Sequence, residues 1–295
     1  MLPKKSVSYF FDSEIGLYQY ANGHPMKPLR VAMTDELIQK YGLYPKMKIY
    51  DKSFVSINDE DLTACHAYEY IELIKNVTPE NRTMYEDQLY QFNFGEDCPV
   101  FNSLYEYCLL YTGGSMIGAK LLNEKKSDIV VNWSGGLHHA KKAEASGFCY
   151  INDCVIAILE LLKVYERVLY VDIDIHHGDG VEEAFYQSDR VLTFSTHKFG
   201  EYFPGTGHID DKGIERGINH AVNFPLKDGM DDESFSMIIR PMLQKIIETF
   251  KPQAIVLQGG ADSLSGDRLG CFNLSIKGHG EALTFLKNFD IPLML

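Results

Sequence analysis

Several features are missing from this sequence of 295 residues, and each absence excludes a class of protein. No apolar run approaches the roughly 18 residues that a membrane-spanning helix needs, and the N-terminus lacks the apolar stretch of a secretory signal. The six cysteines form no Cys-x-x-Cys pair, which excludes a zinc ribbon and a thioredoxin-type redox motif. We therefore expect a soluble, intracellular protein with free thiols and no membrane partner.

Basic residues are scarce as well: 28 Lys and Arg stand against 41 Asp and Glu, which gives a formal charge of −13. This charge disfavours direct binding to nucleic acid, because phosphates would be repelled, and it suits a cationic peptide better. The sequence also contains no repeat, no Pro/Ser-rich linker and no long run of like charge. We therefore expect a single domain over residues 1–295.

Strand-like and helix-like segments alternate along the chain. Short runs rich in Val, Ile and Tyr predict buried strands at residues 7–11, 128–133, 168–175, 191–196 and 254–258. Helical spacing is found at residues 102–123, 152–165, 180–186, 231–250 and 277–289. This order predicts an α/β fold with a mostly parallel sheet, helices on both faces and ligands beyond the carboxyl ends of the strands.

The strongest candidate for a metal site is residues 171–180, Val-Asp-Ile-Asp-Ile-His-His-Gly-Asp-Gly. Period-two alternation places Asp172, Asp174 and His176 on one face of the predicted strand, and a bound cation would compensate their burial. Asp262 follows the 254–258 strand and completes an Asp2His set with a coordination position left open, as in catalytic zinc sites. The alternative is a hydrogen-bonded core cluster, with Asp262 as a turn residue.

Two adjacent histidines follow the 128–133 strand in Ser-Gly-Gly-Leu-His-His-Ala, residues 134–140. His138 and His139 are the candidate acid/base groups. Asp172 and Asp179 are left as their carboxylate partners if Asp174 binds a metal. Adjacent histidines in loops are otherwise often incidental.

Two glycine-bearing loops each carry an aromatic residue, Phe148 after Gly147 and Phe203 within residues 200–207. They suit the walls of a narrow tunnel for an extended substrate, although core packing explains them equally well. Asp97 is a candidate to grip a substrate backbone amide, and an exposed turn aspartate is the alternative.

At these residues the chain closely resembles the class I histone deacetylases, zinc-dependent enzymes of the arginase-deacetylase fold that remove acetyl groups from lysine side chains. The resemblance runs from about Tyr9 to the last residue, through motifs at residues 23–28, 95–101, 133–142 and 262–272. It implies that one zinc ion per chain is held by Asp174, His176 and Asp262.

The resemblance also implies two buried dyads, His138 with Asp172 and His139 with Asp179. His139 would be the preferred general base and later the acid, while His138 assists electrostatically. The substrate-binding residues that it implies are Asp97, Gly147, Phe148, Phe203 and Leu269.

Two further ligands follow from the resemblance alone. A structural potassium ion would lie near zinc, held largely through backbone carbonyls, at Asp172, Asp174, His176, Ser195 and Thr196. An inositol phosphate would bind a basic edge to which Lys27 and Arg268 correspond, although Gln19 and Leu29 replace histidines that the family commonly has nearby.

The sequence departs from the family at its end. The family continues past the strand that begins at Pro292 into a glycine run and a tyrosine that hydrogen-bonds the developing oxyanion, and this sequence stops before both. Loss of such a donor typically lowers the rate roughly a hundred- to a thousandfold. We therefore expect an incomplete sequence, with impaired activity in a chain that ends at Leu295.

The expected function is deacetylation of histones and other proteins, which contributes to transcriptional repression. Acetylated histone tails and corepressor subunits would be the partners, and the nucleus the main location, with the cytoplasm as a second one. One alternative is a small-molecule amidohydrolase of the same fold, acting for example on acetylpolyamines, or a two-metal ureohydrolase. The other is a catalytically impaired, truncated corepressor scaffold.

Overall fold

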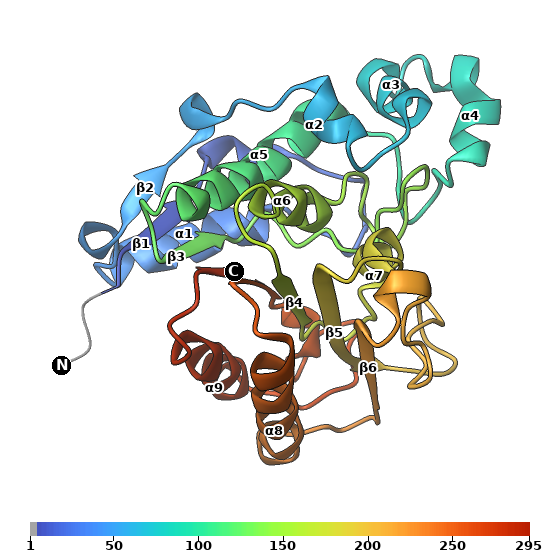
Figure 1. Ribbon diagram of the computed structural model, residues 1–295. Helices are drawn as coiled ribbons and strands as arrows, with labels where there is room; N and C mark the ends of the chain where they lie inside the picture. Colours follow the sequence, from blue (N-terminus) through green and yellow to red (C-terminus); the bar gives the residue numbers. More distant parts are fainter. Residues whose placement is uncertain (1–4) are drawn as a thin grey trace. The chain divides into compact units, whose positions relative to one another are not determined.

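The structure is a computed structural model in which residues 5–295 are described. The chain divides into two compact units, Met1–Glu160 and Leu161–Leu295 (Figure 1). Residues 1–4, which open the stretch considered for a secretory signal, lie outside the described residues. Across residues 5–295, no helix is long and apolar enough to cross a membrane.

Within residues 5–160, the first unit contains three parallel strands. β1 (Val7–Phe10) lies between β2 (Lys48–Tyr50) and β3 (Ile129–Asn132) and pairs with both. The long helix α5 (Leu104–Asn123) packs on β1 and β3. Its close approach requires Gly114, because a Cβ atom there would lie 2.4 Å from the Phe10 ring. The other helices that begin in this unit are α1 (Leu29–Lys40), α2 (Asp59–Thr63), α3 (Tyr68–Asn76), α4 (Glu86–Gln91) and α6 (Asp153–Leu161).

The second unit contains five parallel strands in the order β8-β7-β4-β5-β6. β4 (Val168–Asp172) lies between β7 (Ala254–Gln258) and β5 (Val191–Lys198). Every residue of β4 and β7 is buried, as expected for parallel strands covered on both faces. β6 (Ala221–Leu226) pairs with β5, and β8 (Leu293–Met294) pairs with β7.

Three helices complete the second unit. α7 (Asp179–Phe185) packs against β5. α8 (Asp232–Phe250) and α9 (Ile276–Lys287) lie side by side (Figure 1). Asp231 caps the start of α8 by accepting the Ser234 N–H, and Ser275 caps α9.

The α/β fold class with parallel strands is confirmed, whereas the single domain over residues 1–295 stays a prediction. The predicted 168–175 strand is too long, because β4 ends at Asp172. The reason is local: Asp172 accepts the Asp174 N–H at 3.1 Å and Asp174 accepts the His176 N–H at 2.8 Å. Side chains that bond the backbone two residues ahead turn the chain out of the strand. Asp174 and His176 therefore lie in a loop beyond the strand and not on its face.

Candidate metal centre

Neighbouring strand ends bring the predicted metal ligands together. The loop after β4 carries Asp174 and His176, and Asp262 lies in a short 3-10 helix that follows β7. β4 and β7 run in parallel with Asp172 opposite Gln258, so both loops leave the same edge of the sheet. The three side chains offer ligand atoms that all lie within 4.8 Å of one another.

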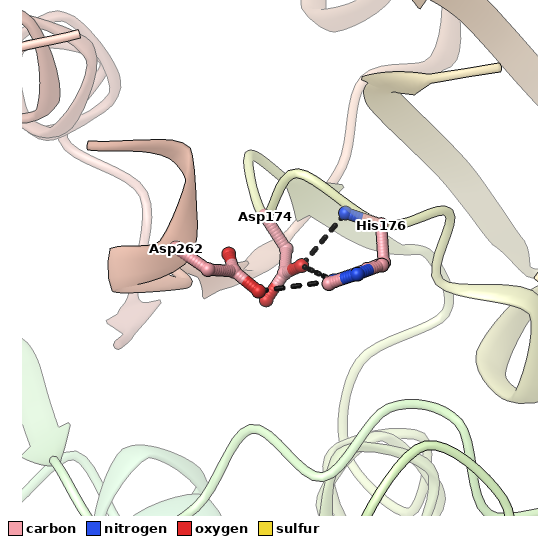
Figure 2. Close-up of side chains that lie close together, drawn as sticks. All are labelled: Asp174, His176 and Asp262. Atoms are coloured by element: carbon pink, nitrogen blue, oxygen red, sulfur yellow. Dashed lines mark hydrogen bonds and ion pairs between the residues drawn. The ribbon is translucent and has the colours of Figure 1, made fainter. Parts of the chain in front are cut away.

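The imidazole of His176 lies between the two carboxylates. Its Nδ1 atom is 3.1 Å from Asp174 Oδ1 and 3.0 Å from Asp262 Oδ2, and Figure 2 shows the three side chains converging. The backbone helps to hold this arrangement, because Ile175 donates its N–H to Asp262 Oδ1 at 3.2 Å. Asp174 is 6% exposed, so water screens the cluster poorly.

The electrostatics of the cluster favour a cation. Burial and the negative charge of Asp174 raise the pKa of Asp262. Burial lowers the pKa of His176, but its hydrogen bonds with the Asp174 and Asp262 carboxylates more than offset this effect and raise the pKa to about 10. Without a metal, a proton on His176 therefore neutralises part of the carboxylate charge, and a divalent ion would do so more completely.

The donor set and its surroundings fit such an ion. Two carboxylate oxygens and one imidazole nitrogen are ligands that zinc, iron and manganese accept. Gly260 forms part of the cradle, because a Cβ atom there would lie 1.9 Å from Asp174 Oδ2. Asp174, His176 and Asp262 could therefore hold a metal ion, as predicted.

Sequence reasoning missed two neighbours of the cluster. Gln258 donates from its side-chain amide to Asp174 Oδ2 at 3.1 Å and accepts the Gly260 N–H at 2.8 Å. Tyr202 stacks on the His176 ring, with centroids 5.2 Å apart. Gln258 could have been found as the polar residue that ends an otherwise apolar strand. Tyr202 could have been found as the second aromatic residue in the glycine-bearing loop of residues 200–207.

The predicted tunnel residues of the second unit lie beside the metal cluster. The Phe203 ring meets His176 edge to face at 5.9 Å and is 41% exposed. Leu269 is equally exposed, and its carbonyl accepts a 2.7 Å hydrogen bond from the Tyr202 hydroxyl. Tyr202 and Phe203 thus contact His176 directly, and Leu269 is linked to them through the Tyr202 hydroxyl.

The residues predicted for potassium lie at the end of β4, in the loop after it and within β5. Asp172 and Ser195 are register partners, and the Thr196 hydroxyl donates to the Asp172 carbonyl at 3.3 Å. The Asp172 carboxylate is fully buried and accepts a 2.6 Å hydrogen bond from Tyr170. Asp179, predicted as the partner of His139, is buried in the first turn of α7.

The predicted acid/base histidines lie in the first unit, in the loop after β3. His138 and His139 are 2% and 4% exposed, and their ring centroids are 4.0 Å apart. The loop approaches a buried carboxylate closely, because a Cβ atom on Gly135 would lie 2.3 Å from Asp153 Oδ2. Gly135 is therefore a packing requirement, and Gly136 adopts a positive φ of 89° that favours glycine.

Two of the remaining predicted substrate residues of the first unit, Asp97 and Phe148, contact His24. Its ring meets Phe148 edge to face at 4.8 Å, and its Nε2 atom is 3.1 Å from the carbonyl oxygen of Asp97. Gly147 and Phe148 both have positive φ, 51° and 69°, and the Tyr20 hydroxyl holds the Phe148 carbonyl at 2.7 Å. A non-glycine residue in this region is strained and is held by its surroundings.

The basic residues predicted for an inositol phosphate, Lys27 and Arg268, are exposed. Lys27 lies just before α1, and Arg268 lies in the loop between β7 and α9. An anion could reach either side chain from solvent.

Comparison with known proteins gives an unambiguous match. Residues 24–294 match the histone deacetylase domain. The chain is 56% identical over 292 residues to histone deacetylase 1 of Homo sapiens and 58% identical over 292 residues to histone deacetylase 19 of Arabidopsis thaliana. Each alignment covers 99% of this chain but only 60% and 58% of the respective relative, so the chain spans about three fifths of their length.

Proposed function

Because the chain belongs to the histone deacetylase family, we propose that the whole protein hydrolyses the acetyl-lysine amides of histones and other proteins. The observation that carries the proposal is the Asp174–His176–Asp262 cluster, which gathers two carboxylates and an imidazole at the carboxyl ends of β4 and β7. Three protein ligands leave room for a substrate or water, as a catalytic site requires.

Zinc is the proposed metal, with one ion per chain held by Asp174, His176 and Asp262. When bound, it supplies Lewis acidity that polarises an amide carbonyl and lowers the pKa of a bound water. Gln258 and Gly260 support the ligand Asp174, one by a hydrogen bond and the other by leaving space for its carboxylate.

The proposed acid/base groups are His138 and His139. His139 takes a proton from the attacking water and returns it to the departing lysine amine, while His138 stabilises the developing charge. The proposed dyads pair His138 with Asp172 and His139 with Asp179, and each carboxylate would fix the tautomer of its imidazole. Burial of both histidines supports this role, because buried imidazoles need defined partners.

The acetyl-lysine stem is proposed to lie between Phe148 and Phe203, with Gly147 beside it and Leu269 at the rim. The half-exposed Phe203 ring beside His176 and the equally exposed Leu269 side chain support this placement. Asp97 would accept hydrogen bonds from the substrate backbone and thereby fix the peptide's direction.

Two further ligands are proposed on family grounds. Potassium would bind at Asp172, Asp174, His176, Ser195 and Thr196, where the end of β4 lies beside Ser195 of β5. An inositol phosphate would contact the exposed side chains of Lys27 and Arg268.

The proposed partners are acetylated histone tails and corepressor subunits, and the proposed setting is transcriptional repression in the nucleus. The formal charge of −13 supports a cationic peptide as substrate. Direct binding to nucleic acid and to membranes is not proposed.

Deacetylation of an acetyl-lysine histone peptide by the full-length protein tests the function. We expect the variants Asp174→Asn and His139→Ala to lose at least a hundredfold in kcat/KM, and only Asp174→Asn to lose zinc. Asp210→Asn is the control, since its side chain is 74% exposed and lies in a surface ion pair. Equal turnover in the wild type and all three variants would refute the assignment. Two tightly held manganese ions per chain would favour a ureohydrolase.

A further inference from the structure

We propose that Asn152 and Asp153, the residues at which α6 begins, are positioning residues that fix the orientation of the His138–His139 pair. The proposal rests on the proposed function of these histidines and adds the groups that hold them. All the contacts that carry it lie within the first unit of the chain.

The Asn152 side chain bonds the two carbonyl groups that flank His139. Its Nδ2 atom donates to the His138 carbonyl at 3.1 Å and to the Ala140 carbonyl at 3.0 Å. Its Oδ1 atom accepts the Val155 N–H at 3.0 Å, which is the bond of a helix N-cap. Every part of this amide is therefore used, and turning it over would set Oδ1 against two carbonyl oxygens.

The Asp153 side chain holds the same loop just upstream. One carboxylate oxygen accepts the Leu137 N–H at 2.8 Å, and the other accepts the Gly136 N–H at 3.1 Å and the Ser115 hydroxyl at 2.5 Å. Asp153 is 1% exposed. Bonds to a buried carboxylate are stronger than bonds between neutral groups, so this anchor is rigid.

His66 in turn fixes the backbone of Asn152. Its Nε2 atom accepts the Asn152 N–H at 3.0 Å, while Nδ1 donates to the Lys141 carbonyl at 2.8 Å. His66 is 1% exposed and its ring packs against Tyr70. The loop is thereby tied to one helix start from Gly136 to Lys141.

The hydrogen bonds from Asn152 to the histidine loop go beyond what capping a helix requires, and they serve to hold the loop in place. A cap requires only the Oδ1 acceptor of Asn152, yet both amide hydrogens are directed at the carbonyl groups of His138 and Ala140. Catalysis depends on positions to within a fraction of an ångström, and a misplacement of about 1 Å can lower a rate roughly a hundredfold. The helix start thus sets the direction of the imidazoles.

The decisive variant is Asn152→Asp in the full-length, zinc-loaded protein. Aspartate keeps the N-cap acceptor and removes both donors to the loop. We expect kcat to fall roughly ten- to a hundredfold with KM within about twofold of wild type. The matched control is Asn58→Asp, an exposed N-cap of α2 whose Oδ1 accepts the Asp61 N–H at 3.0 Å and which touches no part of the loop.

A spectroscopic readout separates this proposal from the proposed function. The imidazole NMR resonances of His138 and His139 should shift in Asn152→Asp and stay in place in Asn58→Asp. If His139→Ala retains full turnover, the proposed catalytic role of His139 is wrong. The NMR comparison would still show whether Asn152 positions the two histidines. Unchanged resonances and unchanged kcat in Asn152→Asp would overturn the proposal.

Two further variants cover loss of folding and the second anchor. Asn152→Ser keeps an N-cap oxygen without adding charge, and it should show the same kcat loss if Asn152→Asp does not fold. Asp153→Asn replaces one acceptor oxygen by a donor and should also lower kcat. Its control is Asp231→Asn, at the exposed start of α8.

Discussion

His66 is a single residue whose protonation the fold opposes. Burial lowers its pKa to about 4, against its hydrogen bonds to backbone carbonyls, which raise it. The Nε2 atom has no room for a proton, because it already accepts the Asn152 N–H. The folded protein therefore requires the neutral imidazole with its proton on Nδ1.

We predict that this requirement makes stability fall in mild acid. An unfolded histidine titrates near pH 6.5, so between pH 6.5 and about 4 the unfolded chain binds a proton that the folded chain does not. The contribution of neutral His66 to the free energy of unfolding is complete above pH 6.5 and is lost as the pH falls. The loss reaches up to about 3 kcal/mol. Urea unfolding of wild type and His66→Asn from pH 7.5 to 4 measures it. The variant should have the flatter profile, and parallel profiles would contradict the prediction.

The second residue-scale prediction concerns the two glycines after β7. Gly260→Ala would place a Cβ atom 1.9 Å from Asp174 Oδ2 and displace that carboxylate, so zinc affinity should fall at least tenfold. Gly259→Ala is the matched control, because its Cβ atom meets only Leu295 at an ordinary 3.6 Å. Competition with a chelator gives both affinities, and equal loss in the two variants would show that the cradle is not responsible.

At the scale of elements, the first turns of α8 and α9 are joined through the side chain of Asp232, in addition to the Arg240–Glu281 ion pair farther along the helices. Asp232, at the start of α8, accepts the Ser275 N–H at 2.8 Å and the Ser275 hydroxyl at 2.5 Å. Gly278, in the first turn of α9, packs over this carboxylate, and a Cβ atom there would lie 2.2 Å from Asp232 Oδ1. The contact between Asp232 and the start of α9 therefore requires a residue without a side chain at position 278.

Two substitutions within α9 should consequently have opposite effects on stability. Gly280 is exposed with nothing within 4 Å of an added Cβ, so Gly280→Ala should stabilise by up to about 1 kcal/mol through helix propensity. Gly278→Ala should instead destabilise by about 1–2 kcal/mol, because Asp232 must move away from Ser275. Thermal unfolding compares the two, and stabilisation by both would rule out the role given to Asp232.

The sequence pattern predicted most of the buried elements and missed most of the exposed ones, and it also missed α3, which buries one face. The apolar run of β7 and the periodicity of α8 are strong signals because both elements face the core. β6 was missed since Pro225 interrupts it, and β2 since it has three largely exposed residues. The exposed helix α1 has too weak an apolar face to show in a periodicity.

The candidate site shows the same division. Aspartates and histidines at strand ends were recognisable because such groups are costly to bury without a partner. Asn152 and Asp153 were interpreted only as a helix start, and their bonds to the histidine loop depend on tertiary contacts that spacing does not encode. The sequence likewise shows Gly260 only as a turn glycine, because its contact with Asp174 depends on the tertiary structure.

For the whole molecule, the excess of acidic residues predicts a salt-dependent encounter with substrate. With a formal charge of −13 over its 295 residues, this chain should attract a basic peptide at low ionic strength and do so less as salt screens the field. We expect KM for a lysine-rich acetylated peptide to rise severalfold between 50 and 300 mM salt. KM for an uncharged acetyl-lysine peptide is the control, and an equal rise for both would exclude electrostatic attraction.

The attachment of the histidine loop to α6 also sets when that loop exchanges hydrogen with solvent. The Gly136 and Leu137 amides are bonded to a buried carboxylate at the start of a helix and not to a neighbouring strand. Their hydrogens can exchange for deuterium only when the first turn of α6 opens, so both should exchange at that turn's rate and far more slowly than a surface loop. The rate of deuterium uptake at the Gly136 and Leu137 amides would thus report the rate at which the first turn of α6 opens.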